Sequence, residues 1–223
     1  MALNPYAHDQ IPVKIMHKPI FVTLLFLCCC AGAVCENFDD AYTVITPAQT
    51  APATGEIMVL EIFWYGCPHC YDFEPYLRQW LKNKPANVTF LLMPGILNNT
   101  WVPHAKAFYT AEKLGILEKI HQPLFDAIHK DQLNIYTDDA IREFFIGFGV
   151  DGEEFSAIYN SKEVWEKILQ AHKLQQNIRI TGVPSVIING KYLSSPSMAR
   201  SYDNMLKVMD YLVDKEGGKS LKP

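Results

Sequence analysis

The chain has 223 residues, of which 49% are hydrophobic, so it can bury one substantial core. Its formal net charge of -4 is small, and the sequence has neither a basic stripe nor an acidic tail. These features predict one globular domain and argue against nucleic acid as a partner.

The first 35 residues have the pattern of an export signal, in which basic residues precede a short apolar run and small residues follow it. These parts are Lys14 and Lys18, the apolar run at residues 20–30, and Ala31, Gly32 and Ala33. The run is too short to span a bilayer. We expect a leader at residues 1–35, with Met16 as an alternative start and cleavage after Ala33 or Cys35. Lipid attachment at Cys35 is disfavoured, because Val34 is a poor residue before a lipidated cysteine.

The folded domain is expected at residues 36–223, and its first half alternates strands with a helix. The predicted elements are a short strand at residues 41–45, a core strand at 56–65, a helix from Pro68 to about residue 84, and a strand at 88–93. The core strand is indicated by a nearly continuous run of apolar and aromatic residues. Pro68 favours the first turn of a helix, so Cys67 should lie at the helix N-terminus.

The second half of the sequence predicts a block of helices, followed by two further strands of the sheet. Residues 101–176 carry helical signals, which indicates an inserted helical subdomain. Asn189-Gly190 is a strong two-residue hairpin turn between strands at residues 185–188 and 191–193, and an amphipathic helix follows. This order predicts an α/β protein with a thioredoxin-like fold and an inserted helical subdomain, with its Cys-x-x-Cys motif where that fold has its redox site.

Cys67 and Cys70 are the candidate reactive pair. The N-H groups and dipole at a helix N-terminus stabilise a thiolate at Cys67, and the adjacent His69 adds hydrogen bonding or charge. A stabilised thiolate makes the corresponding disulfide a strong oxidant. The alternatives are a zinc half-site or an inert local bridge. A zinc site needs further ligands at close spacing, which we do not find, so we predict no metal.

The stretch EIFWYGCPHCYDFE, residues 61–74, resembles the active-site region of the DsbA family of bacterial periplasmic thiol:disulfide interchange proteins. It includes their Pro-His dipeptide, here Pro68-His69. The similarity extends through TGVPS at residues 181–185 and NGKY at residues 189–192. The resemblance implies an oxidoreductase that introduces disulfide bonds, with the Cys67–Cys70 disulfide as its redox centre and no added cofactor.

The resemblance also implies roles for individual residues. Pro184 would be a cis-proline facing the disulfide, although a trans proline opening a strand is the default without the family match. Val183 would pair its backbone with a bound substrate. Glu61 would be a buried acid that helps Cys70 to exchange its proton, the alternative being a strand-end acid that reaches solvent. The family's accompanying lysine has no clear counterpart, because Pro85 occupies the matching place and two lysines only lie nearby.

Other aromatic residues and histidines receive simpler interpretations. Phe63, Trp64 and Tyr65 are expected in the core and at its rim. The remaining histidines of the domain are expected to be ordinary helix-surface or helix-packing residues without identified partners: His104, His121, His129 and His172.

The implied partners are reduced, cysteine-containing exported proteins and a membrane quinone-linked reoxidant resembling DsbB. We expect a monomer in the periplasm. Two other functions stay open. One is a reductase or isomerase that works in the opposite direction. The other is a chaperone-like module that binds extended peptides beside Pro184, with redox chemistry secondary.

Overall fold

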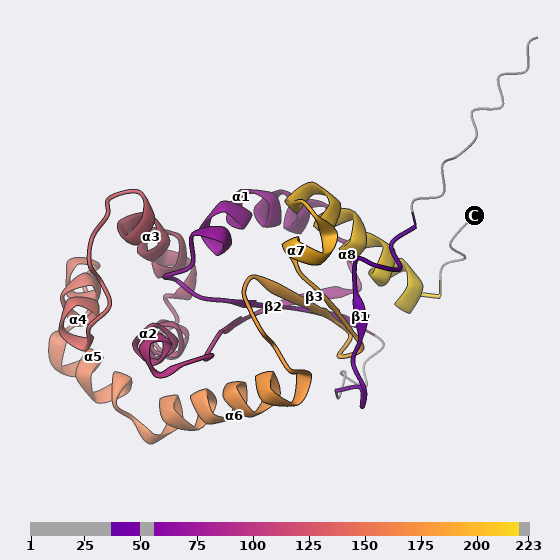
Figure 1. Cartoon of the computed structure of the whole chain (residues 1–223). Helices are drawn as coiled ribbons and strands as arrows, with labels where there is room; N and C mark the ends of the chain where they lie inside the picture. The colour runs from indigo at the N-terminus through magenta and orange to yellow at the C-terminus, as the bar shows by residue number, and fades with distance from the viewer. Residues whose placement is uncertain (1–36, 50–55, 219–223) are drawn as a thin grey trace, which may run out of the picture. The chain divides into compact units, whose positions relative to one another are not determined.

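The computed structural model describes residues 37–49 and 56–218 (Figure 1). The expected leader lies outside these residues, together with Met16, both candidate cleavage sites and Cys35. The strands are β1 (Thr43–Val44), β2 (Ile57–Phe63), β3 (Val88–Pro94), β4 (Ser185–Ile188) and β5 (Tyr192–Ser194). The helices are α1 (Pro68–Asn83), the short 3-10 helix η1 (Asn99–Trp101), α2 (Val102–Lys113), α3 (Leu117–His129), α4 (Asp138–Gly147), α5 (Gly152–Tyr159), α6 (Lys162–Ile178), α7 (Pro196–Ala199) and α8 (Tyr202–Glu216).

The five strands form one mixed sheet in the order β1-β5-β4-β2-β3. β2 is parallel to β3 and antiparallel to β4, and β5 pairs antiparallel with both β4 and β1. Ile188 pairs with Tyr192, so Asn189, Gly190 and Lys191 join β4 to β5, one residue more than the two-residue turn that the sequence predicted. Asn189 and Gly190 have φ angles of 50° and 67°, and positive φ at both positions suits the predicted hairpin. The arrangement confirms the predicted thioredoxin-like fold.

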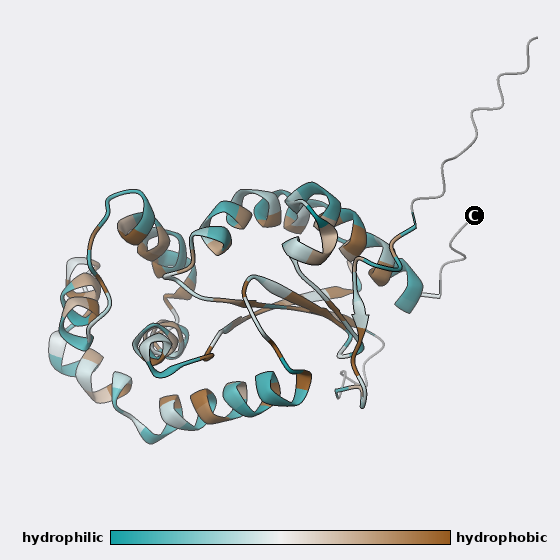
Figure 2. Ribbon diagram, viewed as in Figure 1, coloured by the Kyte–Doolittle hydropathy of each residue, from teal (hydrophilic) through white to brown (hydrophobic). Residues whose placement is uncertain are grey.

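Helices cover both faces of the sheet, as Figure 1 shows with α1, α7 and α8 on one side and α6 on the other. Alternate residues of β2 point to opposite faces, so one strand contributes to two cores. The core beneath α1 and α8 includes Ile57, Val59, Phe73, Leu77, Trp80, Met205, Val208, Met209 and Leu212. The core on the α6 side includes Leu60, Ile62, Ile178, Ile180 and Ile187. β2 is therefore buried on both faces, as its nearly continuous apolar sequence predicts, and Figure 2 colours much of the central sheet as hydrophobic.

The inserted helical subdomain consists of α2 to α6 and lies between β3 and β4 in the chain. Side-chain oxygens cap three of its helices: Thr137 caps α4, Asp151 caps α5 and Ser161 caps α6. Such caps satisfy backbone N-H groups that a helix start leaves unpaired. Phe145 and Phe155 pack with ring centroids 4.8 Å apart in the subdomain core. None of the helices within the described ranges is long and apolar enough to cross a membrane.

Candidate active site

Cys67 is the N-cap residue of α1, and Pro68 is the first residue of the helix. The backbone of Cys67 is extended, with φ -92° and ψ 116°. Its carbonyl oxygen accepts hydrogen bonds from the N-H groups of Cys70 and Tyr71, at 3.1 and 3.2 Å. The sequence predicted this position, and it places the Cys67 sulfur beside the first turn of the helix, where N-H groups lack intrahelical partners.

The surroundings of Cys67 stabilise its thiolate and lower its pKa to about 6. The hydrogen bond from the Cys70 thiol is the largest cause, and burial acts against it. The backbone N-H groups of Cys70 and His69 lower the pKa further, and the charge of His69 adds a smaller effect. Near neutral pH, therefore, most of the reduced protein carries a thiolate at Cys67.

Cys70 has the opposite character, although it lies only one helical turn further along α1. Its side chain is 1% exposed, and burial is the largest of several causes that raise its pKa well above the usual value. The hydrogen bond to Cys67 and the negative charges of Cys67 and Glu61 act in the same direction. Cys70 is thus a thiol that resists ionisation. Both cysteines are reduced in this structure.

The loop before β4 faces Cys67. The Val183–Pro184 peptide bond is cis, as the resemblance led us to expect. The Cys67 thiol donates a hydrogen bond to the carbonyl oxygen of Val183 at 3.5 Å. A cavity of about 370 Å³ adjoins these residues, and its lining includes His69, Thr181, Gly182, Val183, Pro184, Ser185, Ser195, Ser197 and Tyr202. An extended chain lying in this cavity would meet several hydroxyl groups beside the reactive sulfur.

Glu61 is fully buried in the centre of β2, so the alternative of a strand-end acid reaching solvent is wrong. Neither carboxylate oxygen has a hydrogen-bond partner among the described residues. Burial raises the pKa of Glu61 well above its usual value, and the charges of Glu74 and Cys67 raise it further. A buried carboxyl group with these neighbours favours its neutral, protonated form over the carboxylate.

The two lysines near Pro85 do not accompany Glu61. Lys84 donates a hydrogen bond to the carbonyl oxygen of Val88 at 2.5 Å, and Lys82 is exposed. Glu61 pairs in register with Leu92, four residues beyond Val88. Four residues of strand span roughly 13 Å, so the Lys84 ammonium is anchored far along β3 from the acid.

All four histidines for which the sequence identified no partner have one, and His172 contacts Gln176 on its own helix. His121 contacts the hydroxyl group of Tyr65 through Nδ1 at 2.9 Å and Glu74 through Nε2 at 3.3 Å. His129 donates from Nε2 to the carbonyl oxygen of Tyr65 at 2.7 Å. His104 is buried and donates to a backbone carbonyl group, and burial lowers its pKa to about 4. His104, His121 and His129 are helix-packing residues, as expected, but their hydrogen-bond partners were not identified from the sequence.

A sequence signal for the histidine contacts existed on α3. His121 and His129 are two turns apart and flank Phe125, which is fully buried. Residues at this spacing share one helix face, so both histidines point toward the protein interior. The aromatic residues before Cys67 behave as expected: Phe63 and Tyr65 are buried, and half-buried Trp64 stacks on Trp101 with ring centroids 4.4 Å apart.

The residues that the sequence singled out thus fall into one region. His69, Val183 and Pro184 lie around the Cys67 sulfur. Glu61 lies beneath α1, where its charge raises the pKa of Cys70 and the charge of Cys67 raises the pKa of Glu61. Among the described residues, no group of three His, Cys, Asp or Glu side chains is placed to hold a metal ion. The arrangement can carry out thiol–disulfide exchange with its own side chains.

Comparison with known proteins identifies the family. The model of the DSBA-like thioredoxin domain matches residues 87–210. The thiol:disulfide interchange protein DsbA of Pseudomonas aeruginosa is 39% identical over 78% of this chain and 83% of its own. The protein of that name from Burkholderia cepacia is 35% identical over 92% of this chain and its entire length.

Solved structures agree with these sequence matches. The crystal structure of Pseudomonas aeruginosa DsbA aligns with a TM-score of 0.76 and 36% identity, covering 82% of this chain and 95% of that one. The oxidoreductase DsbA from Xylella fastidiosa aligns with a TM-score of 0.74 and 32% identity, covering 79% and 95% of the two chains. This chain belongs to the DsbA family of thioredoxin-fold proteins.

Proposed function

We propose that this protein is a thiol:disulfide oxidoreductase that introduces disulfide bonds into exported proteins through Cys67 and Cys70. The observation that carries the proposal is the contrast between the two thiols, since the pKa of Cys67 is lowered to about 6 and that of Cys70 is raised. Stabilising the thiolate of the reduced protein makes its disulfide a stronger oxidant. The chain's relatives, named thiol:disulfide interchange proteins, perform this class of chemistry.

The first chemical step is attack on the Cys67–Cys70 disulfide. A substrate thiolate forms a bond to Cys67 Sγ, and the bond between the two cysteine sulfurs breaks. Attack at Cys67 is favoured because Cys70 is 1% exposed and lies behind it on α1. Cys70 leaves as a thiolate in an environment that disfavours its charge. It therefore takes a proton at once, and Glu61 is the acid we assign to supply it.

The second step releases the oxidised substrate. A second substrate thiolate attacks the substrate sulfur of the mixed disulfide, and Cys67 leaves as a thiolate. The substrate has then lost two electrons and two protons. The protein has gained both electrons and the proton on Cys70, and the other proton passes to solvent. The low pKa of Cys67 makes it a good leaving group, which drives the exchange toward oxidised substrate.

Substrate is held, in this proposal, along the loop that contains Pro184. The carbonyl oxygen of Val183, which lies 3.5 Å from Cys67 Sγ, would accept a backbone N-H of an extended substrate. Hydroxyl groups of Thr181, Ser195 and Ser197 line the adjoining cavity and suit polar side chains or backbone groups next to a substrate cysteine. Backbone recognition of this kind accepts many different sequences.

Turnover requires that the reduced pair be oxidised again. We assign this step to a membrane protein that passes the two electrons to a quinone, as the resemblance to the DsbA family implies. The same resemblance supports a periplasmic location for the exported protein. Its redox centre is its own disulfide, which needs no added cofactor for the exchange steps described above.

A redox titration tests the direction of the chemistry. The purified protein is equilibrated with glutathione buffers, and the state of Cys67 and Cys70 is read by thiol trapping and mass spectrometry. We expect a couple more oxidising than about -200 mV, well above thioredoxin's roughly -270 mV. A potential near that of thioredoxin would instead favour the reductase or isomerase.

The chaperone-like alternative is tested separately. A variant with both Cys67→Ala and Cys70→Ala keeps the cavity beside Pro184 but cannot exchange disulfides. We expect it to lose the ability to oxidise a reduced, unfolded substrate protein. Full activity of this variant in supporting substrate folding would assign the protein to peptide binding.

A further inference from the structure

The proposed role of Glu61 raises the question of how this acid recovers its proton after each turnover. Glu61 is 0% exposed, Cys70 is 1% exposed and Cys67 is 8% exposed. When substrate is joined to Cys67, the active-site face is covered further. A route for protons from another side of the protein would therefore serve the reaction, and the inference below rests on the proposed function.

The strand pattern places Glu61 under α1. Ile57, Val59 and Glu61 alternate along β2, and the first two pack beneath α1 and α8. The buried residues of α1 include Cys70 and, one turn later, Glu74. Two carboxyl groups and the Cys70 thiol thus share one interior region. The charge of Glu74 contributes to the raised pKa of Glu61, in agreement with their proximity.

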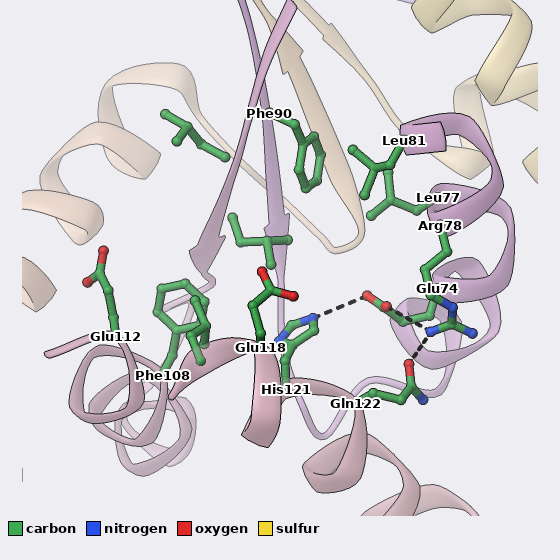
Figure 3. Close-up of a pocket in the computed structure, with 13 residues that line it drawn as sticks. Glu74, Leu77, Arg78, Leu81, Phe90, Phe108, Glu112, Glu118, His121 and Gln122 are labelled. Atoms are coloured by element: carbon green, nitrogen blue, oxygen red, sulfur yellow. Dashed lines mark hydrogen bonds and ion pairs between the residues drawn. The ribbon is translucent and has the colours of Figure 1, made fainter. Parts of the chain in front are cut away.

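Glu74 belongs to a chain of polar contacts that reaches the inserted subdomain (Figure 3). Its Oε1 lies 3.3 Å from Nε2 of His121, and its Oε2 lies 3.4 Å from the Arg78 guanidinium. The other ring nitrogen of His121 lies 2.9 Å from the hydroxyl group of Tyr65. His121 is contributed by α3, so the subdomain supplies the ring that holds this buried carboxylate.

A cavity of about 430 Å³ connects this chain of contacts with solvent. Its lining includes Glu74, Arg78, His121 and Gln122 together with apolar residues of α1 and β3. The Arg78 side chain is 48% exposed, whereas the side chains of Glu74 and His121 are only 6% and 13% exposed. The lining contains none of the residues around the reactive sulfur, which adjoin a different cavity.

We infer that Glu74 and His121 form a proton entry to Glu61, separate from the face where Cys67 meets its substrate. His121 is a positioning residue in this scheme: it holds Glu74 and exchanges protons between Glu74 and water in the cavity. A histidine ring suits this task because one nitrogen can take up a proton while the other releases one. The inserted subdomain thereby takes part in the redox cycle.

The proton balance of this route is simple. Glu61 gives its proton to the Cys70 thiolate and becomes a carboxylate. Protonated His121 passes a proton to Glu74, and Glu74 passes one to Glu61 through a bridging water. A bridge is needed because Glu61 shares no hydrogen bond with any described residue. His121 then takes a proton from the cavity, and the same route runs in reverse when Cys70 is oxidised again.

Other charged or titratable groups around His121 must be considered in a pH experiment. They are Glu74 and Arg78 from α1, Glu112 from α2, Glu118 from α3 and the hydroxyl group of Tyr65, which precedes α1 in the chain. β3 contributes only apolar residues to this cavity. Substitution of His121 itself is therefore needed to assign a pH response to this ring.

The first test is His121→Gln in the full chain. Glutamine keeps a donor for Glu74 but does not take up a proton near neutral pH. Single-turnover oxidation of a reduced peptide is followed by stopped-flow fluorescence between pH 5 and pH 8, in H₂O and in D₂O. We expect the rate to fall about tenfold at pH 7, with a larger solvent isotope effect. The equilibrium with glutathione should change less than about twofold, because a proton route alters rates and not end states.

A second variant distinguishes a route from two independent effects. Glu74→Gln retains hydrogen bonding to His121 and Arg78 but cannot carry a proton, and it should slow the reaction to a similar extent. The double variant should be no slower than either single variant, because both interrupt the same route. His172→Gln is the control: this ring lies on α6 and has Gln176 as its hydrogen-bond partner, so its rate should not change.

The outcomes separate this inference from the proposed function. If the wild-type protein is an oxidant but both single variants keep its rate and isotope effect at every pH, the proton entry is refuted and the function stands. Multiplicative slowing in the double variant would also refute it. If the wild-type protein has a thioredoxin-like potential in the glutathione titration, the proposed function itself fails.

Discussion

Cys67 and Cys70 are separated by one turn of α1, yet their environments are opposite. Cys67 lies at the helix start beside hydrogen-bond donors, which lower its pKa to about 6. Cys70 faces the interior with Glu61 nearby, and its pKa is raised. The comparison teaches that one thiol is built to leave and the other to hold a proton. The burial of Cys70 gives the disulfide a preferred point of attack, and the stabilised thiolate of Cys67 gives a preferred direction of exchange.

The largest expected effects come from removing either sulfur. Cys67→Ser should abolish all measurable disulfide transfer, because the Cys67–Cys70 disulfide that the substrate attacks can no longer form. Cys70→Ser should also abolish transfer, but Cys67, which is 8% exposed where Cys70 is 1% exposed, should still form a stable mixed disulfide with glutathione. Mass spectrometry after incubation with oxidised glutathione would distinguish the two variants.

Thermal unfolding of both serine variants provides the control, since a transition close to that of the reduced wild-type protein shows that the fold is intact. A glutathione adduct on Cys70 in the Cys67→Ser variant would contradict the assigned order of attack. It would mean that burial does not protect Cys70 from exchange.

The next largest expected effect of the contrast between the two thiols is on how the unfolding free energy depends on pH. A thiol whose pKa is lower in the folded than in the unfolded protein adds stability above its unfolded pKa, and this stability is lost as pH falls through the folded value. For Cys67 that window extends from about 9 down to about 6. Between pH 5 and pH 8 the reduced protein should gain about 2.5 kcal/mol in unfolding free energy relative to the oxidised protein.

Urea unfolding of both redox forms at several pH values would measure this difference. The oxidised protein is the control, because titratable groups away from the two cysteines contribute to both forms and cancel in the difference. A difference between the two forms that stays constant from pH 5 to pH 8 would show that Cys67 has an ordinary thiol pKa.

Substitution of Glu61 tests whether this acid supplies the proton that Cys70 takes up when it leaves. Glu61→Gln should slow single-turnover oxidation about tenfold or more at pH 7, because the leaving Cys70 thiolate loses its acid. Glu61→Leu should slow it similarly but raise the unfolding free energy by about 1–3 kcal/mol, since an unpaired polar group no longer has to be buried. Stopped-flow kinetics and urea unfolding measure the two effects. Unchanged kinetics in both variants would remove Glu61 from the mechanism.

The sequence predicted the parts of the site that depend on local order. Pro68 placed Cys67 at a helix start, and Asn189-Gly190 placed the hairpin, because caps and turns are specified by a few adjacent residues. The cis bond before Pro184 came from the family resemblance, since local sequence favours trans. The short helix α7 was not predicted, because four residues give too weak a periodicity.

The contacts of His121 and His129 could not be predicted in the same way. Each meets Tyr65 across more than fifty residues of sequence, so their partners depend on how the inserted subdomain packs against the sheet. The proximity of Glu61 and Glu74 could be predicted in part. Strand alternation and helix periodicity each place one carboxyl group on an inward face, but only the packing of α1 on β2 brings the faces together.

His69 gives the smallest expected effect and the sharpest test of what creates the contrast. Its ring charge lowers the pKa of Cys67 less than the Cys70 thiol and the backbone N-H groups do. His69→Ser keeps those N-H groups, so we expect the Cys67 pKa to rise by about one unit and the glutathione equilibrium to shift about tenfold toward the disulfide. Thiolate absorbance at 240 nm measures the first change and thiol trapping the second. The Tyr202 hydroxyl group donates a hydrogen bond to the backbone carbonyl group of His69, and this bond should persist in His69→Ser. Tyr202→Phe removes this bond but keeps the histidine ring, so it serves as the comparison variant.

A shift of more than about a hundredfold in the glutathione equilibrium of His69→Ser would mean that the histidine ring, and not the helix start, sets the difference between the two thiols.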